Sequence, residues 1–250
     1  FHILAQQAEK LPPCQAQCPN SGDIRGWLGI IAQREKNGLT LDEAYDSAWQ
    51  TIAELNPMPA TIGRICPHPG EDLCTRDGKD GAVSINAMER FLGDWGLSRG
   101  LSLPSLNAER QPESVGVIGS GPASLSFAYQ MARRGYPVTM YEKQEHPGGM
   151  LRYAIPDYRL PRDVLDAEVD RILELNISLI RNADVGDTIP MEELRDRHDM
   201  LFVGLGAQAA LRLGRPGERG RGVRWGSEEG LRREGHAGPG RGGRARGGGG

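Results

Sequence analysis

Residues 114–142 constrain the fold of this chain more than any other stretch. A short apolar run, SVGVI, leads directly into the turn GSGPAS, and a segment with helical periodicity follows as far as Gly135. A second apolar run, VTMY, ends on Glu142. Glycines in such a turn let the backbone approach a pyrophosphate at the helix N-terminus, and the acidic residue accepts hydrogen bonds from the ribose. The order of these elements therefore predicts a dinucleotide-binding unit.

The turn departs from the usual G-x-G-x-x-G pattern at its third glycine, where Ser124 stands. Serine is small, so we still expect the helix to pack closely on the strand. Glu142 argues against a 2′-phosphate at this site, because its carboxylate would repel that group.

The rest of the chain divides around this unit. A helix over 162–175 and strands over Ile177–Ile180 and Met200–Val203 continue the alternation, which predicts an α/β fold with an incomplete parallel sheet, a partial Rossmann-like domain over 114–211. Residues 1–95 instead predict an all-helical module, with helices over 1–13, 24–35, 40–55 and 83–95. Thr40 and Glu43 fit a capping box at the start of the helix over 40–55. Pro12-Pro13 is expected to end the first helix, and residues 96–113 form a linker.

Residues 212–250 differ in composition from everything before them. They carry a net charge of +6, against −9 for residues 1–211, and 15 of the 35 glycines lie in 214–250. Such a segment cannot bury enough apolar surface to fold, so we expect a disordered Gly/Arg-rich tail. We favour a frameshift or truncation near residue 212 over an Arg/Gly tail that binds RNA. The acidic body argues against nucleic acid as the main partner.

Targeting signals are not evident in the sequence. The chain has no run of 18 apolar residues and does not start with a basic segment followed by an apolar one. These observations predict a cytoplasmic protein that does not interact with membranes.

All four cysteines lie in the helical module, as C-x3-C-P at Cys14 and Cys18 and as C-P-x6-C at Cys66 and Cys74. Disulfides would need an oxidising compartment, for which the sequence carries no export signal. Four thiolates from separated loops suit a [4Fe–4S] cluster, whereas zinc sites more often use C-x2-C spacings. We favour the iron–sulfur cluster, with zinc and structural thiols as open alternatives. His68 lies between two prolines and is expected to be a turn residue rather than a ligand.

Residues 1–211 resemble the small (β) subunit of NADPH-dependent glutamate synthase and its relatives, which include the N-terminal half of dihydropyrimidine dehydrogenase. The motifs that carry this resemblance are CQAQCP, GRICPHPGEDLC, VGVIGSGPASL, YEKQEHPGGMLRYAIPDYRLP and GLGA. The resemblance implies that NAD(P)H reduces FAD and that electrons then leave singly through [4Fe–4S] clusters to a large catalytic partner subunit. It assigns the redox chemistry to the cofactors, so no catalytic residue is predicted.

The resemblance also implies which residues hold the cofactors. The cluster ligands would be Cys14, Cys18, Cys66 and Cys74. The FAD-binding residues would be Gly119, Ser120, Gly121, Pro122, Ala123, Ser124, Glu142, Lys143, Gly149, Leu151, Arg159 and Val185.

Three departures from the family pattern limit these expectations. Gly70 stands where relatives usually have a cysteine, and Gln6 and Glu9 stand where many have two more, so one cluster is the most that the cysteines allow. In relatives, the cysteines that correspond to Cys14 and Cys74 bind one cluster, and those that correspond to Cys18 and Cys66 bind another. Glu89 aligns with a non-cysteine ligand of one relative. The second glycine-rich unit, which binds NADPH in the family, is not found in this sequence.

Three functions remain in competition at this point. The first is an electron-input flavoprotein of the glutamate synthase small-subunit type. The second is an NAD(P)H oxidoreductase of the same architecture that serves pyrimidine or sulfur metabolism. The third is a non-enzymatic iron–sulfur adaptor.

Overall fold

The computed structural model describes residues 11–207. The predicted helix over 1–13 falls mostly outside this range, and the predicted Gly/Arg-rich tail over 212–250 falls wholly outside it. The helices of the first part are α1 (Pro13–Gln17), α2 (Ile24–Ala32), α3 (Leu41–Ala53), α4 (Pro59–Ile65), α5 (Pro69–Asp72), α6 (Asp77–Asp80) and α7 (Ile85–Ser98). The second part consists of β1 (Val115–Ile118), α8 (Pro122–Ala132), β2 (Val138–Tyr141), α9 (Met150–Tyr153), α10 (Arg162–Leu173), β3 (Ile177–Ile180), α11 (Met191–Arg197) and β4 (Met200–Val203).

Local sequence explains how several helices begin. Thr40 and Glu43 form the predicted capping box of α3: the Glu43 N–H donates to the Thr40 hydroxyl (3.3 Å) and the Thr40 N–H to the Glu43 carboxylate (2.8 Å). The expectation for Pro12-Pro13 was wrong, because Pro13 is the first residue of α1 rather than the end of a helix. Proline suits that position, where the N–H it lacks would have no helical partner.

Helices α4 and α7 cross with their backbones in close contact. A Cβ atom at Gly93 would lie 2.2 Å from the Ala60 nitrogen, and one at Gly63 would lie 2.6 Å from the Arg90 Cα. Both positions therefore require glycine, and α4 has little room to shift against α7.

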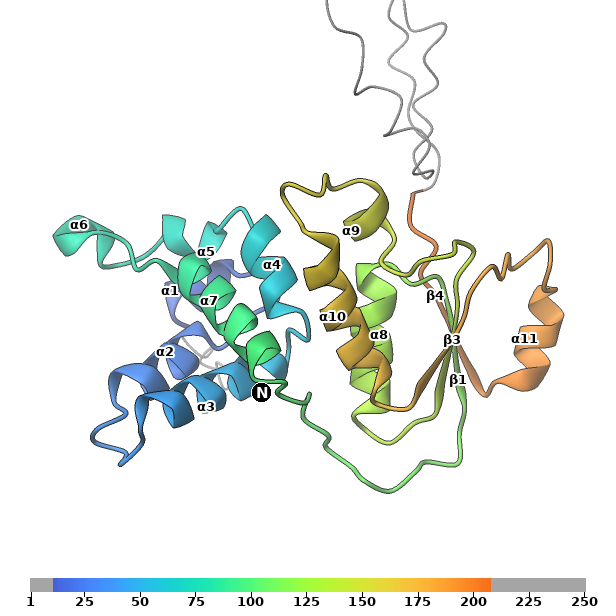
Figure 1. Cartoon of the computed structure of the whole chain (residues 1–250), viewed down its shortest axis with the longest axis horizontal. Helices are drawn as coiled ribbons and strands as arrows, with labels where there is room; N and C mark the ends of the chain where they lie inside the picture. The colour runs from blue at the N-terminus through green and yellow to red at the C-terminus, as the bar shows by residue number, and fades with distance from the viewer. Residues whose placement is uncertain (1–10, 208–250) are drawn as a thin grey trace, which may run out of the picture. The chain divides into compact units, whose positions relative to one another are not determined.

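The second part is a doubly wound parallel sheet, as predicted, with strand order β3-β2-β1-β4. Figure 1 shows α8 and α10 on one face of this sheet and α11 on the other. The strands over Ile177–Ile180 and Met200–Val203 lie where the sequence predicted them, and α10 ends at Leu173, close to the predicted boundary. The short helix α11 was not predicted.

The helical part and the sheet part share one hydrophobic core. Trp49, Ala53 and Met58 of the first part belong to the same buried cluster as Tyr129 and Leu165 of the second. The buried Tyr129 hydroxyl donates across this boundary to the Ala53 carbonyl oxygen (2.6 Å), and burial raises the pKa of Tyr129 to about 12. The described residues up to Gly206 accordingly pack as one compact unit.

Candidate functional site

The glycine turn after β1 is shaped by close contacts that only glycine allows. Gly119 has φ of +93°, and a Cβ there would lie 2.6 Å from the Gly204 carbonyl oxygen. Gly149 has φ of +52°, and a Cβ there would lie 2.8 Å from the Gly121 Cα. Three separate segments therefore meet at this turn, each without a side chain in the way.

The turn is open on the side where a ligand would approach. A Cβ built at Gly121 would meet no atom of the described residues within 4 Å. Helix α8 begins directly after it, and within residues 11–207 no side chain caps this N-terminus. Pro122 occupies the first helical position, so the N–H groups of Ala123 and Ser124 are the first ones that could face an anion. The geometry fits the pyrophosphate of a dinucleotide.

Glu142 closes the turn from the end of β2. Its Oε2 accepts hydrogen bonds from the Ser120 N–H (2.8 Å) and from the Ser120 hydroxyl, and its Oε1 accepts one from the Gln144 N–H (2.8 Å). The residue is 7% exposed. A carboxylate offers about four acceptor positions, so these bonds leave room for a ribose hydroxyl.

Ser124 fits in place of the third glycine because the facing residue is itself a glycine. Ser124 is fully buried, and its hydroxyl donates to the Gly204 carbonyl oxygen (3.4 Å). A Cβ at Gly204 would lie 2.1 Å from that hydroxyl oxygen. Sequence reasoning assigned no site role to Gly204, and the GLGA motif at the end of the last strand was the only signal for one.

The remaining residues predicted to bind FAD have mixed surroundings. Lys143 is paired with Asp184 (2.6 Å), and the hydrogen bond to that carboxylate raises the pKa of Lys143. Leu151 is buried in the main core, and Val185 packs against the smaller core on the α11 side of the sheet. Arg159 is exposed: its backbone N–H donates to the Pro156 carbonyl oxygen (2.9 Å), and its guanidinium makes no hydrogen bond or ion pair with the residues that the structure describes. Their contacts with FAD stay predictions.

The four cysteines come from two separate segments of the helical part. Cys14 lies in α1 and Cys18 directly follows it, whereas Cys66 follows α4 and Cys74 comes two residues after α5. Helices α1 and α5 are in contact. Gly70 lies at this contact, where a Cβ would be 3.0 Å from the Cys14 carbonyl oxygen. His68 has φ of +60° and is the N-cap residue of α5.

Two of the thiols accept backbone hydrogen bonds. The His68 N–H donates to the Cys66 sulfur (3.4 Å) and the Val83 N–H to the Cys74 sulfur (3.5 Å). Burial raises the pKa of Cys66; the His68 hydrogen bond opposes this, and the nearby charges of Glu89 and Cys18 add to it. Cys18 and Cys66, 48 positions apart in the chain, are thus neighbours.

Burial also raises the pKa of Glu89, against the hydrogen bond that its carboxylate accepts from Asn56 (2.9 Å). The charge of Glu89 is among the causes that raise the pKa of Cys66, and a role of Glu89 as a cluster ligand stays a prediction.

Within residues 11–207, no three His, Cys, Asp or Glu side chains gather as ligands of one metal ion. A cubane cluster takes one thiolate for each iron, so its ligands surround the cluster and do not converge on one ion. Four thiols, two of which accept N–H···S hydrogen bonds, fit such a cluster, since hydrogen bonds to the sulfurs are among the features that tune its potential.

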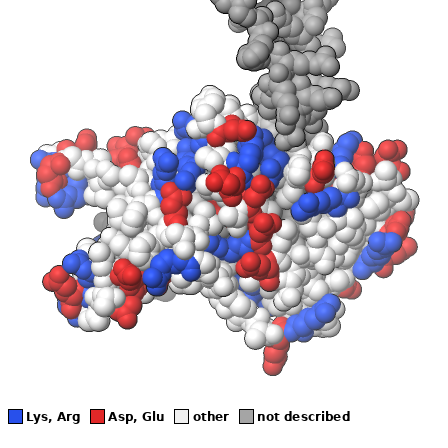
Figure 2. Space-filling model, viewed as in Figure 1, with Lys and Arg blue, Asp and Glu red and all other residues white. Residues whose placement is uncertain are grey.

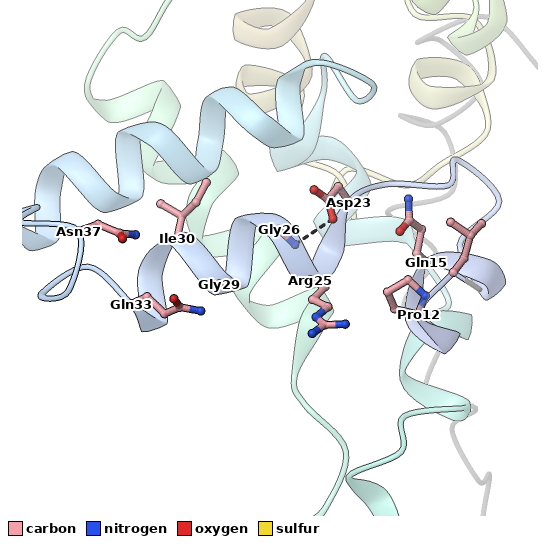
Figure 3. A pocket seen from close by; sticks show the side chains of 10 residues that line it. Pro12, Gln15, Asp23, Arg25, Gly26, Gly29, Ile30, Gln33 and Asn37 are labelled. Atoms are coloured by element: carbon pink, nitrogen blue, oxygen red, sulfur yellow. Dashed lines mark hydrogen bonds between the residues drawn. The ribbon is translucent and has the colours of Figure 1, made fainter. Parts of the chain in front are cut away.

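Figure 3 shows an open pocket that belongs to neither of these sites. It has a volume of about 480 Å³ and lies along α2, lined by Gly26, Gly29, Ile30 and Gln33 together with residues at the start of α1. None of the residues predicted to bind a cofactor lines it.

Two family models match the chain. Residues 7–101 match the 4Fe–4S cluster domain described as domain II of dihydropyrimidine dehydrogenase, and residues 117–166 match an NAD(P)-binding Rossmann-like domain. The glutamate synthase [NADPH] small chain of Bacillus subtilis is 31% identical over 214 residues, which are 86% of this chain and 43% of the relative. The chain is a homologue of that small chain.

Other relatives are similar to this chain to the same degree. The NAD-dependent dihydropyrimidine dehydrogenase subunit PreT of Escherichia coli is 35% identical over 80% of this chain and 47% of its own length. The NADP(+)-dependent formate dehydrogenase subunit beta of Moorella thermoacetica is 32% identical over 82% of this chain and 31% of its own length. The resemblance predicted from the motifs is confirmed, and the chain spans less than half the length of each of these relatives.

Surface charge on this chain is mixed. Figure 2 shows Lys and Arg interspersed with Asp and Glu over the face drawn there. Arg64 pairs with Asp94 (2.7 Å) and Arg162 with Asp157 (2.6 Å). In the part of the chain described here, no helix is long and apolar enough to cross a membrane.

Proposed function

We propose that this chain is the electron-input part of an iron–sulfur flavoprotein, which takes electrons from NAD(P)H and passes them to a catalytic partner subunit. The observation that carries the proposal is one compact unit that combines a glycine turn open to a dinucleotide with four free thiols in a helical part that matches a 4Fe–4S cluster domain. The division into a cysteine module (1–95) and a nucleotide-binding domain (114–211) is part of this proposal.

The glycine turn would hold FAD. The N–H groups at the start of α8 would bind the pyrophosphate, and Glu142 would accept a ribose hydroxyl while the Ser120 bonds fix its orientation. Since the carboxylate of Glu142 would repel a 2′-phosphate, the turn favours FAD over NADP. The matching family model is named for NAD(P), so NAD at the same turn is the second candidate.

Cys14, Cys18, Cys66 and Cys74 would hold one [4Fe–4S] cluster. Gly70 cannot ligate iron, and the cysteines supply four thiolates, the number that one such cluster requires. When bound, the flavin and the cluster would together convert a two-electron hydride into single electrons. The backbone N–H groups of His68 and Val83 would then stabilise negative charge on the sulfurs.

The relatives support a partner subunit, because their names describe subunits or chains of larger enzymes. We propose a large subunit of the glutamate synthase type as that partner. NADPH is carried over from the names of the B. subtilis and M. thermoacetica relatives. Residues 11–207 contain one glycine turn of this kind, which the proposal assigns to FAD.

Anaerobic purification followed by assays of iron, acid-labile sulfide, flavin and nicotinamide nucleotide tests the proposal. We expect about four irons and one FAD per chain. Gly121→Val should lose the flavin and keep the fold, because its side chain would enter the open side of the turn. Gly29→Ala is the matched control, because a Cβ there also lies more than 4 Å from the atoms of residues 11–207 beyond its own helix, and Gly29 is outside the turn. Retention of NAD instead of FAD would favour the second candidate, and absence of both iron and nucleotide would overturn the proposal.

A further inference from the structure

Glu168 is a buried carboxylate that connects the two parts of the unit. It lies in the middle of α10 and is 0% exposed. Its Oε1 accepts a hydrogen bond from the Ala60 N–H (2.7 Å) and its Oε2 accepts one from the Thr61 N–H (2.7 Å). Both donors lie in the first turn of α4, more than 100 positions away in the chain.

These two bonds complete the hydrogen bonding at the start of α4. Pro59 is the first helical residue and has no N–H, and the Ile62 N–H already donates to the Met58 carbonyl oxygen (2.9 Å). The N–H groups of Ala60 and Thr61 are the remaining donors, and Glu168 accepts both. A carboxylate at this end also interacts favourably with the helix dipole. Glu168 therefore caps α4 from another part of the fold.

Helix α4 ends at Ile65, and Cys66 is its C-cap. The Cys66 N–H donates to the Ile62 carbonyl oxygen (2.9 Å), so the backbone of Cys66 is bonded to the last helical turn. Thr61 and Cys66 are about 7.5 Å apart along the axis at 1.5 Å per residue. The close contact of Ala60 with Gly93 leaves α4 little room to shift against α7. A constraint on the first turn of α4 is thus a constraint on Cys66.

The first half of α10 contacts the segments that form the glycine turn. Leu165 lies against Gly148, where a Cβ would be 3.2 Å from its side chain, and Asp166 pairs with Arg152 of α9. The Gly148 N–H donates to the Ser120 carbonyl oxygen (3.0 Å). Packed groups therefore join the nucleotide turn to Glu168, and Glu168 to α4.

We propose that Glu168 is a positioning residue, which holds helix α4, and with it Cys66, at a fixed place relative to the nucleotide turn. The inference rests on the proposed function, because a fixed distance between the two sites matters only if electrons pass from one to the other. The geometry itself needs neither cofactor to be bound.

The role of Glu168 is separable from a general contribution to stability. Burial raises the pKa of Glu168 to about 7, and its hydrogen bonds and the charge of Arg171 only partly oppose this. Arg171 lies one turn along α10, and its guanidinium donates to the Gly96 carbonyl oxygen (2.9 Å). Keeping an ionised carboxylate here is costly. We therefore expect the bonds from Ala60 and Thr61 to fix the position of α4 without adding much to the free energy of unfolding.

The test compares the full chain with its Glu168→Gln and Glu168→Ala variants at pH 8, where Glu168 is ionised. Glu174→Gln, an exposed glutamate at the end of the same helix, is the matched control. Two rates are measured without added cofactors: hydrogen exchange of the Ala60 and Thr61 amides, and alkylation of Cys66 by iodoacetamide relative to Cys14. Unfolding free energies are measured alongside. The glutamine variant keeps the size of the side chain, so it is expected to fold even if the alanine variant does not.

In Glu168→Gln, exchange at Ala60 and Thr61 should accelerate about tenfold or more, as expected on losing a charge-assisted hydrogen bond. Cys66 alkylation should accelerate while that of Cys14 does not. Unchanged exchange and unchanged Cys66 reactivity would overturn the inference, and so would an equal rise at both cysteines together with a lower unfolding free energy. Wild-type chain without iron or flavin would count against the proposed function alone, because both rates are read without cofactors.

Discussion

The glycine turn is built from nearby stretches of chain, whereas the cysteine site is assembled from distant ones. Ser120 and Glu142 belong to one strand–helix–strand unit and are hydrogen-bonded to each other. Cys18 and Cys66 lie 48 positions apart in the chain, and Cys66 follows α4, which contacts both α7 and α10. We therefore expect changes in the packing of α4 to damage the cysteine site, while the nucleotide turn depends on its own few residues.

The largest effect is expected for Gly93→Ala. The new Cβ would lie 2.2 Å from the Ala60 nitrogen, so α4 would have to move away from α7, which would disturb the bonds of Ala60 and Thr61 to Glu168. Overpacking of this kind should lower the free energy of unfolding by roughly 3–4 kcal/mol. Chemical denaturation would measure it, with Gly29→Ala as a control that should be neutral or slightly stabilising. If Gly93→Ala left the free energy of unfolding nearly unchanged, α4 would not be tightly packed against α7, and the cysteine site would not depend on that packing.

The second prediction concerns pH and Glu168. Its pKa is raised from 4.5 to about 7, so between these values the folded chain retains a proton that the unfolded chain has lost. The stability that this group contributes is present below pH 4.5 and is lost as pH rises through 7, by on the order of 3 kcal/mol. Denaturation at pH 5 and pH 8 would show a smaller decrease in Glu168→Gln than in the wild type. Equal decreases in both proteins would contradict the prediction.

Glu142→Gln tests whether the nucleotide turn can be changed without affecting the cysteine site. The amide would place an NH2 group against the N–H donors of Ser120 or Gln144 and remove the charge that accepts the ribose hydroxyl. Affinity for FAD should fall by about 2 kcal/mol, roughly thirtyfold, in a fluorescence titration. Iron content should stay unchanged. Glu145→Gln, an exposed neighbour in the same loop, should leave both properties unaltered.

The smallest effect is expected for Thr40→Ala. The change removes the hydroxyl that caps α3 and should cost about 1 kcal/mol of stability. Flavin and iron content should both remain as in the wild type, because neither site uses this end of α3. Thr51→Ala, which lacks only a hydrogen bond to a carbonyl within the same helix, is the control and should cost less.

Sequence patterns predicted those parts of the fold that depend on short segments. The strands over Ile177–Ile180 and Met200–Val203 and the capping box at Thr40 were found because alternation and capping act within a few residues. Helices α4, α5 and α6 were missed because each is too short for helical periodicity to stand out. The role of Pro13 was misread, since proline both ends helices and begins them.

The sequence by itself determined the glycine turn, the acidic residue that closes it and the presence of four thiols, because these depend on local backbone freedom and residue chemistry. Only the tertiary structure decided that Tyr129 bonds to Ala53, that Gly204 makes room for Ser124, and that Glu168 caps α4. The physical reason is that a buried hydrogen-bonding group must find a partner wherever packing brings one, and no fixed spacing in the sequence records which partner that is.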